Sequence, residues 1–124
     1  MGLFDFLKRK PSKQEVVAED KYWSLATSEN EIVDPTVEQI ETAVKNATPH
    51  QTIFATLTYN HSGLEIESIQ AISEDGIYRF EALTTSGTIY VKNDVSYEET
   101  IDFFTHFFQY QRVSGFRSWP TESY

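Results

Sequence analysis

Alternating apolar and polar residues in the middle of the chain predict four β-strands. We expect the strands at about residues 51–59, 64–74, 77–85 and 88–93, because clusters of turn-forming residues separate the apolar runs. The strongest turn signal is Asp75-Gly76, since Asp-Gly between alternating stretches favours a two-residue hairpin. Strands joined by such short turns pair in antiparallel fashion. The pattern therefore predicts a four-stranded antiparallel meander.

Short loops also predict the register of the meander. Two-residue loops at 75–76 and 86–87 place Ala71 opposite Phe80 and Ala82 opposite Val91. The predicted apolar face then consists of Ile69, Ala71, Tyr78, Phe80, Ala82, Ile89 and Val91. The other face carries Gln70, Glu74, Arg79, Glu81, Leu83, Tyr90 and Lys92. The two turns agree on a single apolar face, which supports the meander.

The first hairpin requires an irregularity. A four-residue loop places Leu57 opposite Ile66, but Ile66 is then out of phase with the apolar residues later in its own strand. One extra residue at Glu67-Ser68, a β-bulge, restores the phase. The whole register scheme predicts that four residues are buried together, namely Ile53, Leu57, Phe80 and Val91.

Helical periodicity flanks the meander on both sides. Asp34-Pro35 is typical of a helix start, with Asp34 as N-cap, and Thr48-Pro49 marks the end of that helix. Ser96 with Glu99 predicts a capping box for a second helix that reaches Gln111. The fold class is thus α+β, in the order α-β-β-β-β-α, with both helices on the apolar face. The alternative places the helices on opposite faces, with a second core of Phe54, Ile72, Ile77, Leu83 and Tyr90.

Residues 1–33 differ in composition from the rest of the chain. We interpret them as an N-terminal extension and linker, partly flexible, with the polar linker at residues 8–20 and a short docking element at Tyr22–Leu25. Residues 34–124 are expected to form one domain. Apolar residues at positions 3, 4, 6 and 7 precede Lys8-Arg9-Lys10, a combination found in weak membrane anchors. Membrane contact by residues 1–10 is therefore one alternative, beside docking on the domain or a free tail.

The charge of the chain indicates which classes of partner it can bind. The net charge is −9, and residues 14–124 hold six basic and eighteen acidic side chains, a net −12. This negative charge repels the phosphate backbone of nucleic acids. It therefore argues against nucleic-acid binding and favours a basic partner protein. The absence of cysteine and of an apolar signal segment points to the cytoplasm.

No motif in the sequence predicts catalysis. The five glycines never cluster, and His50, His61 and His106 lack partners at metal-ligand spacing. Asp102 lies one helical turn from His106, but both are expected on a solvated helix side. Glycosidase-type chemistry needs two carboxylates across a cleft, one of them buried, whereas Glu65 and Glu67 are expected on the open sheet face. We therefore expect no enzyme activity, no metal and no cofactor.

Candidate binding residues come from two groups. The acidic group is expected on the open sheet face and consists of Glu65, Glu67 and Glu81. The aromatic group comprises residues left over after the core is assigned, namely Tyr90, Tyr110 and Trp119. Acidic residues steer a basic partner, and exposed aromatic residues contribute much of the energy at protein interfaces.

Residues 34–119 resemble small bacterial immunity proteins that neutralise secreted toxins. The shared features are a helix entered at Asp34-Pro35-Thr36, a four-stranded meander, a Phe-rich helix and a following Trp119. The resemblance implies a non-enzymatic protein that binds a cognate toxin. The alternatives are a small-molecule or peptide-binding module, and a peripheral membrane adaptor that uses the N-terminal segment.

Overall fold

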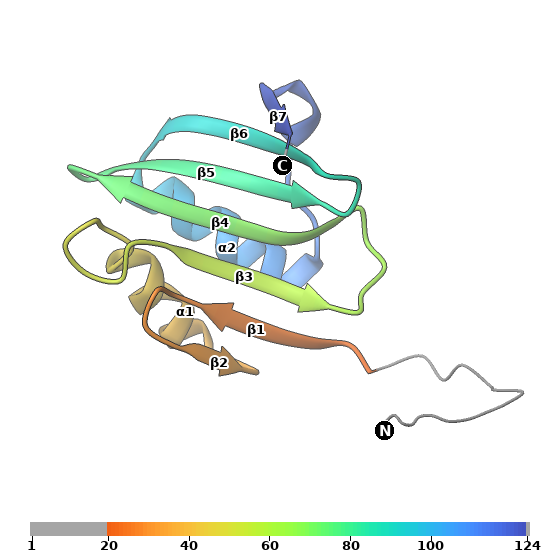
Figure 1. Cartoon of the computed structure of the whole chain (residues 1–124), viewed down its shortest axis with the longest axis horizontal. Coiled ribbons are helices and arrows are strands. Elements are labelled where there is room, and N and C mark those ends of the chain that lie inside the picture. Colours follow the sequence, from red (N-terminus) through yellow and green to blue (C-terminus); the bar gives the residue numbers. More distant parts are fainter. Residues whose placement is uncertain (1–19, 124) are drawn as a thin grey trace, which may run out of the picture.

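The computed structural model describes residues 20–123, which form one antiparallel sheet covered on one face by two helices (Figure 1). The strands are β1 (Tyr22–Ala26), β2 (Glu31–Val33), β3 (Ala55–Asn60), β4 (Ile66–Glu74), β5 (Ile77–Thr84), β6 (Thr88–Val95) and β7 (Thr121–Ser123). The helices are α1 (Val37–Lys45), α2 (Tyr97–Tyr110) and the short 3-10 helix η1 (Phe116–Ser118). Across the sheet the order is β2-β1-β3-β4-β5-β6-β7.

The prediction of a four-stranded sheet is wrong, because the described residues form seven strands. The meander β3–β6 lies in the middle, β1 and β2 extend it beyond β3, and β7 extends it beyond β6. The three additional strands have only three to five residues and share no alternation of apolar and polar residues, since β1 has a single polar residue, Ser24, and β7 has no apolar one. Such segments give little periodicity of their own and form strands because the exposed edges of the meander are available for pairing.

Residues 22–33 belong to the same sheet as the rest of the body. β1 lies between β2 and β3, and Leu25 on β1 is buried in the main core. The short docking element expected at Tyr22–Leu25 is therefore an internal strand. The proposed linker at residues 8–20 and the candidate membrane segment at residues 1–10 lie, apart from residue 20, outside the described residues.

The β4–β5 hairpin confirms the prediction from Asp75-Gly76. Ala71 lies opposite Phe80, and both turn residues have positive φ, +53° at Asp75 and +81° at Gly76, as a type I′ turn requires. The predicted bulge is also present, since the β4–β5 register shifts between Ile66 and Ser68.

The predicted β5–β6 register is wrong by one residue. Ala82 lies opposite Tyr90 rather than Val91, because the loop has three residues, 85–87, and ends at Gly87 with φ of +97°. A shift of one residue exchanges the two faces of a strand. Tyr90 therefore packs towards the helices, and Val91 is buried outside the main core on the opposite face. Lys92 also changes sides, and its Nζ lies 4.0 Å from a carboxylate oxygen of Glu99 on α2.

The first hairpin also differs from the prediction. Leu57 lies opposite Ile69, because the connection between β3 and β4 is longer than four residues. Ile53 precedes β3 with φ of +66° and is 47% exposed. Of the four residues expected to be buried together, only Leu57 and Phe80 share the main core.

The core lies between the sheet and the two helices. Its buried members include Leu25, Ile40, Val44, Leu57, Ile69, Phe80, Val95, Phe104 and Phe107. Helix α1 begins two residues later than predicted: Thr36, not Asp34, is the N-cap, and it forms a capping box with Gln39. The predicted N-cap of α2 is correct, since the Ser96 hydroxyl accepts a hydrogen bond from the Glu99 amide. Because both helices cover one face, the other face of the sheet is left uncovered (Figure 1).

Candidate functional site

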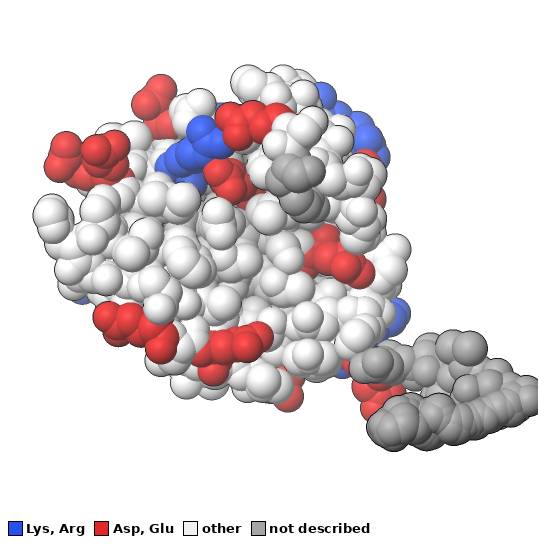
Figure 2. Space-filling model, in the orientation of Figure 1, with Lys and Arg blue, Asp and Glu red and all other residues white. Residues whose placement is uncertain are grey.

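The largest surface feature is the sheet face that the helices leave open, which we call the uncovered face. Side chains alternate between the two faces of a strand, so the register assigns its members. They include Ser24, Thr56, Thr58, Ser68, Gln70, Ile72, Arg79, Glu81, Leu83, Ile89 and Val91. Figure 2 shows this face as a broad, mainly uncharged surface with acidic side chains around its edge.

Hydrogen bonds run across the centre of the uncovered face from strand to strand. The Thr56 hydroxyl donates to Oε1 of Gln70 at 2.7 Å, and Nε2 of Gln70 donates to Oε1 of Glu81 at 3.0 Å. The hydroxyl groups of Thr58 and Ser68 lie 2.7 Å apart. These bonds hold the polar side chains in fixed positions, so a partner would meet a preorganised surface.

Arg79 and two carboxylates form the charged part of the face. Nε of Arg79 lies 2.6 Å from Oε2 of Glu81, and Nη2 lies 2.7 Å from Oε1 of Glu122 on β7. The hydrogen bonds that Arg79 donates to Glu122 and Glu81 raise the pKa of Arg79 above its ordinary value. Glu81 is only 8% exposed, although it faces away from the helices. Its charge is therefore balanced within the protein.

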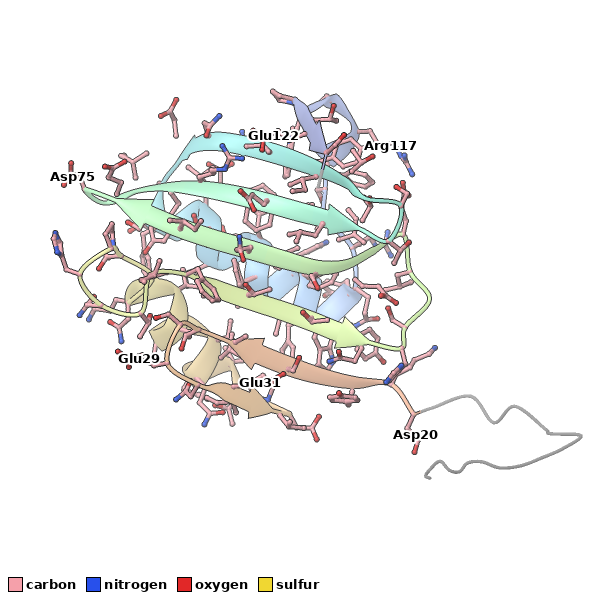
Figure 3. The ribbon with its side chains drawn as sticks, in the orientation of Figure 1. Asp20, Glu29, Glu31, Asp75, Arg117 and Glu122 are labelled. Atoms are coloured by element: carbon pink, nitrogen blue, oxygen red, sulfur yellow. The ribbon has the colours of Figure 1, made fainter. Side chains whose placement is uncertain are left out.

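Exposed acidic residues lie around the margin of the uncovered face. Glu31 on β2 and Glu74 on β4 point to this side of the sheet, as their pairing with Ala26 and Ile77 requires. Figure 3 places Glu29 and Glu31 at one margin of the face, Asp75 at the β4–β5 turn and Glu122 beside β7. The described residues as a whole contain six basic and sixteen acidic side chains.

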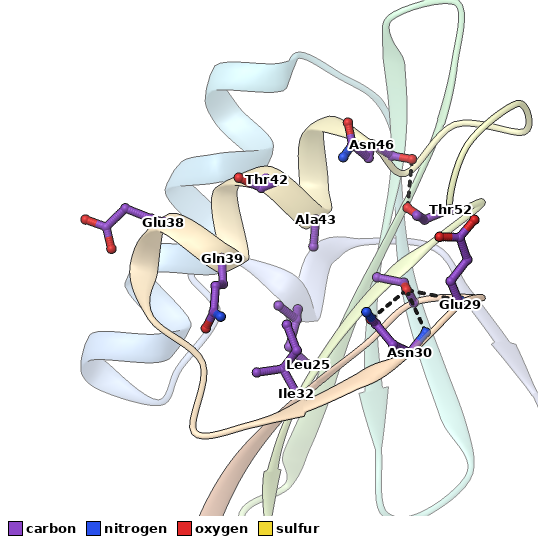
Figure 4. Close-up of a pocket in the computed structure, with 11 residues that line it drawn as sticks. Leu25, Glu29, Asn30, Ile32, Glu38, Gln39, Thr42, Ala43, Asn46 and Thr52 are labelled. Atoms are coloured by element: carbon purple, nitrogen blue, oxygen red, sulfur yellow. Dashed lines mark hydrogen bonds between the residues drawn. The ribbon is translucent and has the colours of Figure 1, made fainter.

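A second feature is a groove of about 290 Å³ between α1 and the β1–β2 hairpin, which we call the α1 groove (Figure 4). Its apolar floor is formed by Leu25 on β1 and Ile32 on β2. Along α1 it is lined by residues spaced at helical intervals, Gln39, Thr42, Ala43 and Asn46. Figure 4 shows Glu38 at one end of the groove, with its carboxylate turned outward, and Glu29 at the other end.

The three predicted acidic residues do not form one patch. Glu65 pairs with Arg117, and the Glu67 carboxylate accepts hydrogen bonds from the Ser62 hydroxyl and the Gly63 amide. Glu81 belongs to the uncovered face, where Arg79 and Gln70 satisfy it. Each carboxylate therefore has a local structural partner.

The three predicted aromatic residues are also separated. The rings of Tyr90 and Phe116 lie 4.9 Å apart on the helix side of the sheet. Trp119 is partly buried with its ring 5.8 Å from Phe80, whereas Tyr110 is 51% exposed near the end of α2. Tyr90 and Trp119 thus contribute to core packing, and Tyr110 is the exposed member of the group.

Sequence reasoning missed the α1 groove because it missed β1 and β2. The available signal was the turn between them, in which the Thr27 hydroxyl accepts hydrogen bonds from the amides of Glu29 and Asn30. Threonine and asparagine at such spacing favour a turn between two strands.

Among residues 20–123, no group of three or more His, Cys, Asp and Glu side chains is placed to hold a metal ion. Neither α-helix in this part of the chain combines the length and the apolar character that a membrane crossing requires. No protein-family model, curated protein or solved structure matches the chain.

Proposed function

We propose that the protein is a non-catalytic binding domain whose uncovered face contacts a basic partner protein. The observation that carries this proposal is the arrangement of that face, a mainly uncharged surface of hydrogen-bonded side chains in which Glu81 is paired with Arg79, with exposed acidic residues at its margin. Protein interfaces have the same organisation, since charged residues are depleted in their buried centre and the rim is polar.

The paired side chains at the centre favour binding in energetic terms. Polar groups that lose water without gaining a partner cost free energy when an interface forms. On the uncovered face, Thr56, Gln70 and Glu81 already satisfy one another, and Thr58 satisfies Ser68. Half-buried Ile72, Leu83 and Ile89 add apolar area beside them. A partner therefore displaces water from this face at a low cost.

The excess of acidic side chains favours a partner with a cationic surface. With sixteen acidic and six basic side chains in the described residues, the body attracts a cationic surface and speeds its approach. An immunity protein needs such an acidic surface when it neutralises a toxin whose active site is basic and binds anions. We propose that the protein is an immunity protein of this kind. The proposal places the protein in the cytoplasm, in keeping with its lack of cysteine.

The test is the salt dependence of association with a purified partner. The variant Glu31→Gln/Glu74→Gln removes two charges from the margin of the uncovered face, and Glu98→Gln/Asp102→Asn removes two from α2 on the other side. We expect the first pair to slow association several-fold at low salt and the second pair to have a smaller effect. The difference should shrink at physiological salt, where the Debye length is about 8 Å. Equal effects of the two pairs would contradict binding through this face.

A further inference from the structure

We propose that the outer edge of β2 and the α1 groove together bind an extended segment of a second protein, which adds to the sheet as a further strand and inserts one Lys or Arg side chain into the groove. This site lies on the helix side of the sheet. It is therefore distinct from the uncovered face, and either proposal survives the failure of the other.

The edge of the sheet supplies the backbone part of the site. In the strand order β2 is terminal, so among the described residues no strand pairs with its outer side. An unpaired edge presents N–H and C=O groups to which an extended peptide adds by main-chain hydrogen bonds. β2 carries no proline within Glu31–Val33, so every residue retains its N–H group.

The groove supplies the specificity part of the site. Ile32 is the residue of β2 that points towards the helices, and its side chain lies on the groove floor with Leu25. The side chains of an added strand alternate in the same way, so the residue placed beside Ile32 also points towards α1. The smallest side chain of the α1 wall is Ala43, which is 8% exposed. A long side chain has room at this position.

The chemistry of the groove selects a basic side chain. Its floor is apolar, which suits the methylene stem of Lys or Arg. Glu29 and Glu38 lie at its two ends, and the Glu38 carboxylate is turned outward to solvent, where the charged group of such a side chain would emerge (Figure 4). Both carboxylates belong to exposed residues and have no ion pair among the described residues. Charge complementarity therefore points to a basic residue flanked by strand-forming residues, as in Val-Lys-Val.

The experiment selects peptides from a displayed library of random twelve-residue sequences on the full-length protein. We expect the enriched peptides to share one Lys or Arg within a run of strand-forming residues. Dissociation constants are then measured for the best peptide and for its analogue with norleucine in place of the basic residue. Methylating the backbone nitrogens at alternate positions identifies edge pairing, because one alternate set should abolish binding and the other should spare it.

Matched variants locate the site. Ala43→Met fills the groove and should weaken binding at least tenfold, whereas Ala26→Met makes the same change on the other side of β1 and should change it less than twofold. Glu38→Gln is an exposed, conservative change that should weaken the basic peptide several-fold and leave the norleucine analogue unaffected. Glu98→Gln on α2 is its control.

Four results would overturn the proposal. They are a selection that enriches no peptide, enriched peptides without a basic residue, equal binding by Ala43→Met and Ala26→Met, and N-methylation effects without alternation. Two further outcomes would also overturn the proposal, because each would show that the site binds a different occupant. One is tight binding of a synthetic peptide with the sequence of residues 1–19, and the other is a dimer of the full chain that Ala43→Met dissociates.

Discussion

Glu81 is the most constrained residue of the uncovered face, because its carboxylate is nearly buried and depends on two neighbours. Arg79→Gln removes its cationic partner and leaves Gln70 as the remaining donor. We expect the free energy of unfolding to fall by about 1–3 kcal/mol, the range for charged hydrogen bonds and unsatisfied buried groups. Urea unfolding at neutral pH measures this.

The control for Arg79→Gln is Glu122→Gln, which breaks the other ion pair of the same arginine. Glu122 is exposed, so its loss should cost less than about 1 kcal/mol. Equal costs for the two variants would mean that the burial of Glu81 contributes nothing.

Tyr78 joins β5 to the end of α1 through its hydroxyl, which donates to the Val44 carbonyl at 2.8 Å. Tyr78→Phe should lower the free energy of unfolding at pH 7 by about 0.5–1.5 kcal/mol. Burial raises the pKa of Tyr78, because it disfavours the phenolate. The folded state thus holds the phenol proton more tightly than the unfolded state.

Because the folded-state pKa of Tyr78 is raised, the stability that the protonated Tyr78 hydroxyl contributes depends on pH. This contribution to the free energy of unfolding is fully present below the ordinary tyrosine pKa of about 10. It is lost as pH rises through the raised folded-state pKa. The stability difference between wild type and Tyr78→Phe should therefore shrink above pH 10. Urea unfolding of both proteins at pH 7 and at about pH 11 tests this, and a constant difference would contradict it.

At the scale of elements, β1 and β2 are needed for the fold. β1 covers the edge of β3, and the Trp23 ring on β1 stacks on Tyr59 at 4.3 Å and meets the Phe107 ring at 5.4 Å. A chain that starts at residue 34 exposes this edge and these aromatic rings. We expect it to lose cooperative thermal unfolding, whereas a chain that starts at residue 20 should keep it. Circular dichroism melts compare the two, and a cooperative melt of the shorter chain would contradict the role of β1.

Elements with local turn chemistry were predictable from the sequence. Asp75-Gly76 fixed the β4–β5 hairpin, and the phase of the apolar residues located the bulge between Ile66 and Ser68. The β5–β6 loop was harder, because Gly87 fits the end of either a two-residue or a three-residue loop. One residue of difference then exchanged Tyr90 and Val91 between the faces.

At the scale of the whole molecule, the sheet edges and the candidate sites were not predictable. β1, β2 and β7 are short, and β1 pairs with β3 across the intervening β2 and α1, so no local pattern marks the partner. The α1 groove exists only once these strands are placed. The uncovered face was predictable in part, since Gln70, Arg79 and Glu81 were assigned to it correctly and Tyr90 and Lys92 were not.

Photo-crosslinking from two positions shows whether the uncovered face contacts a basic protein. A photoreactive phenylalanine analogue replaces Ile72 on this face in one variant and exposed Asp102 on α2 in another. Each full-length variant is expressed in the cells from which the chain comes, and the adducts are identified by mass spectrometry. We expect position 72 to crosslink to one basic protein and position 102 not to crosslink to it. The same adduct from both positions, or an adduct from position 102 alone, would contradict it.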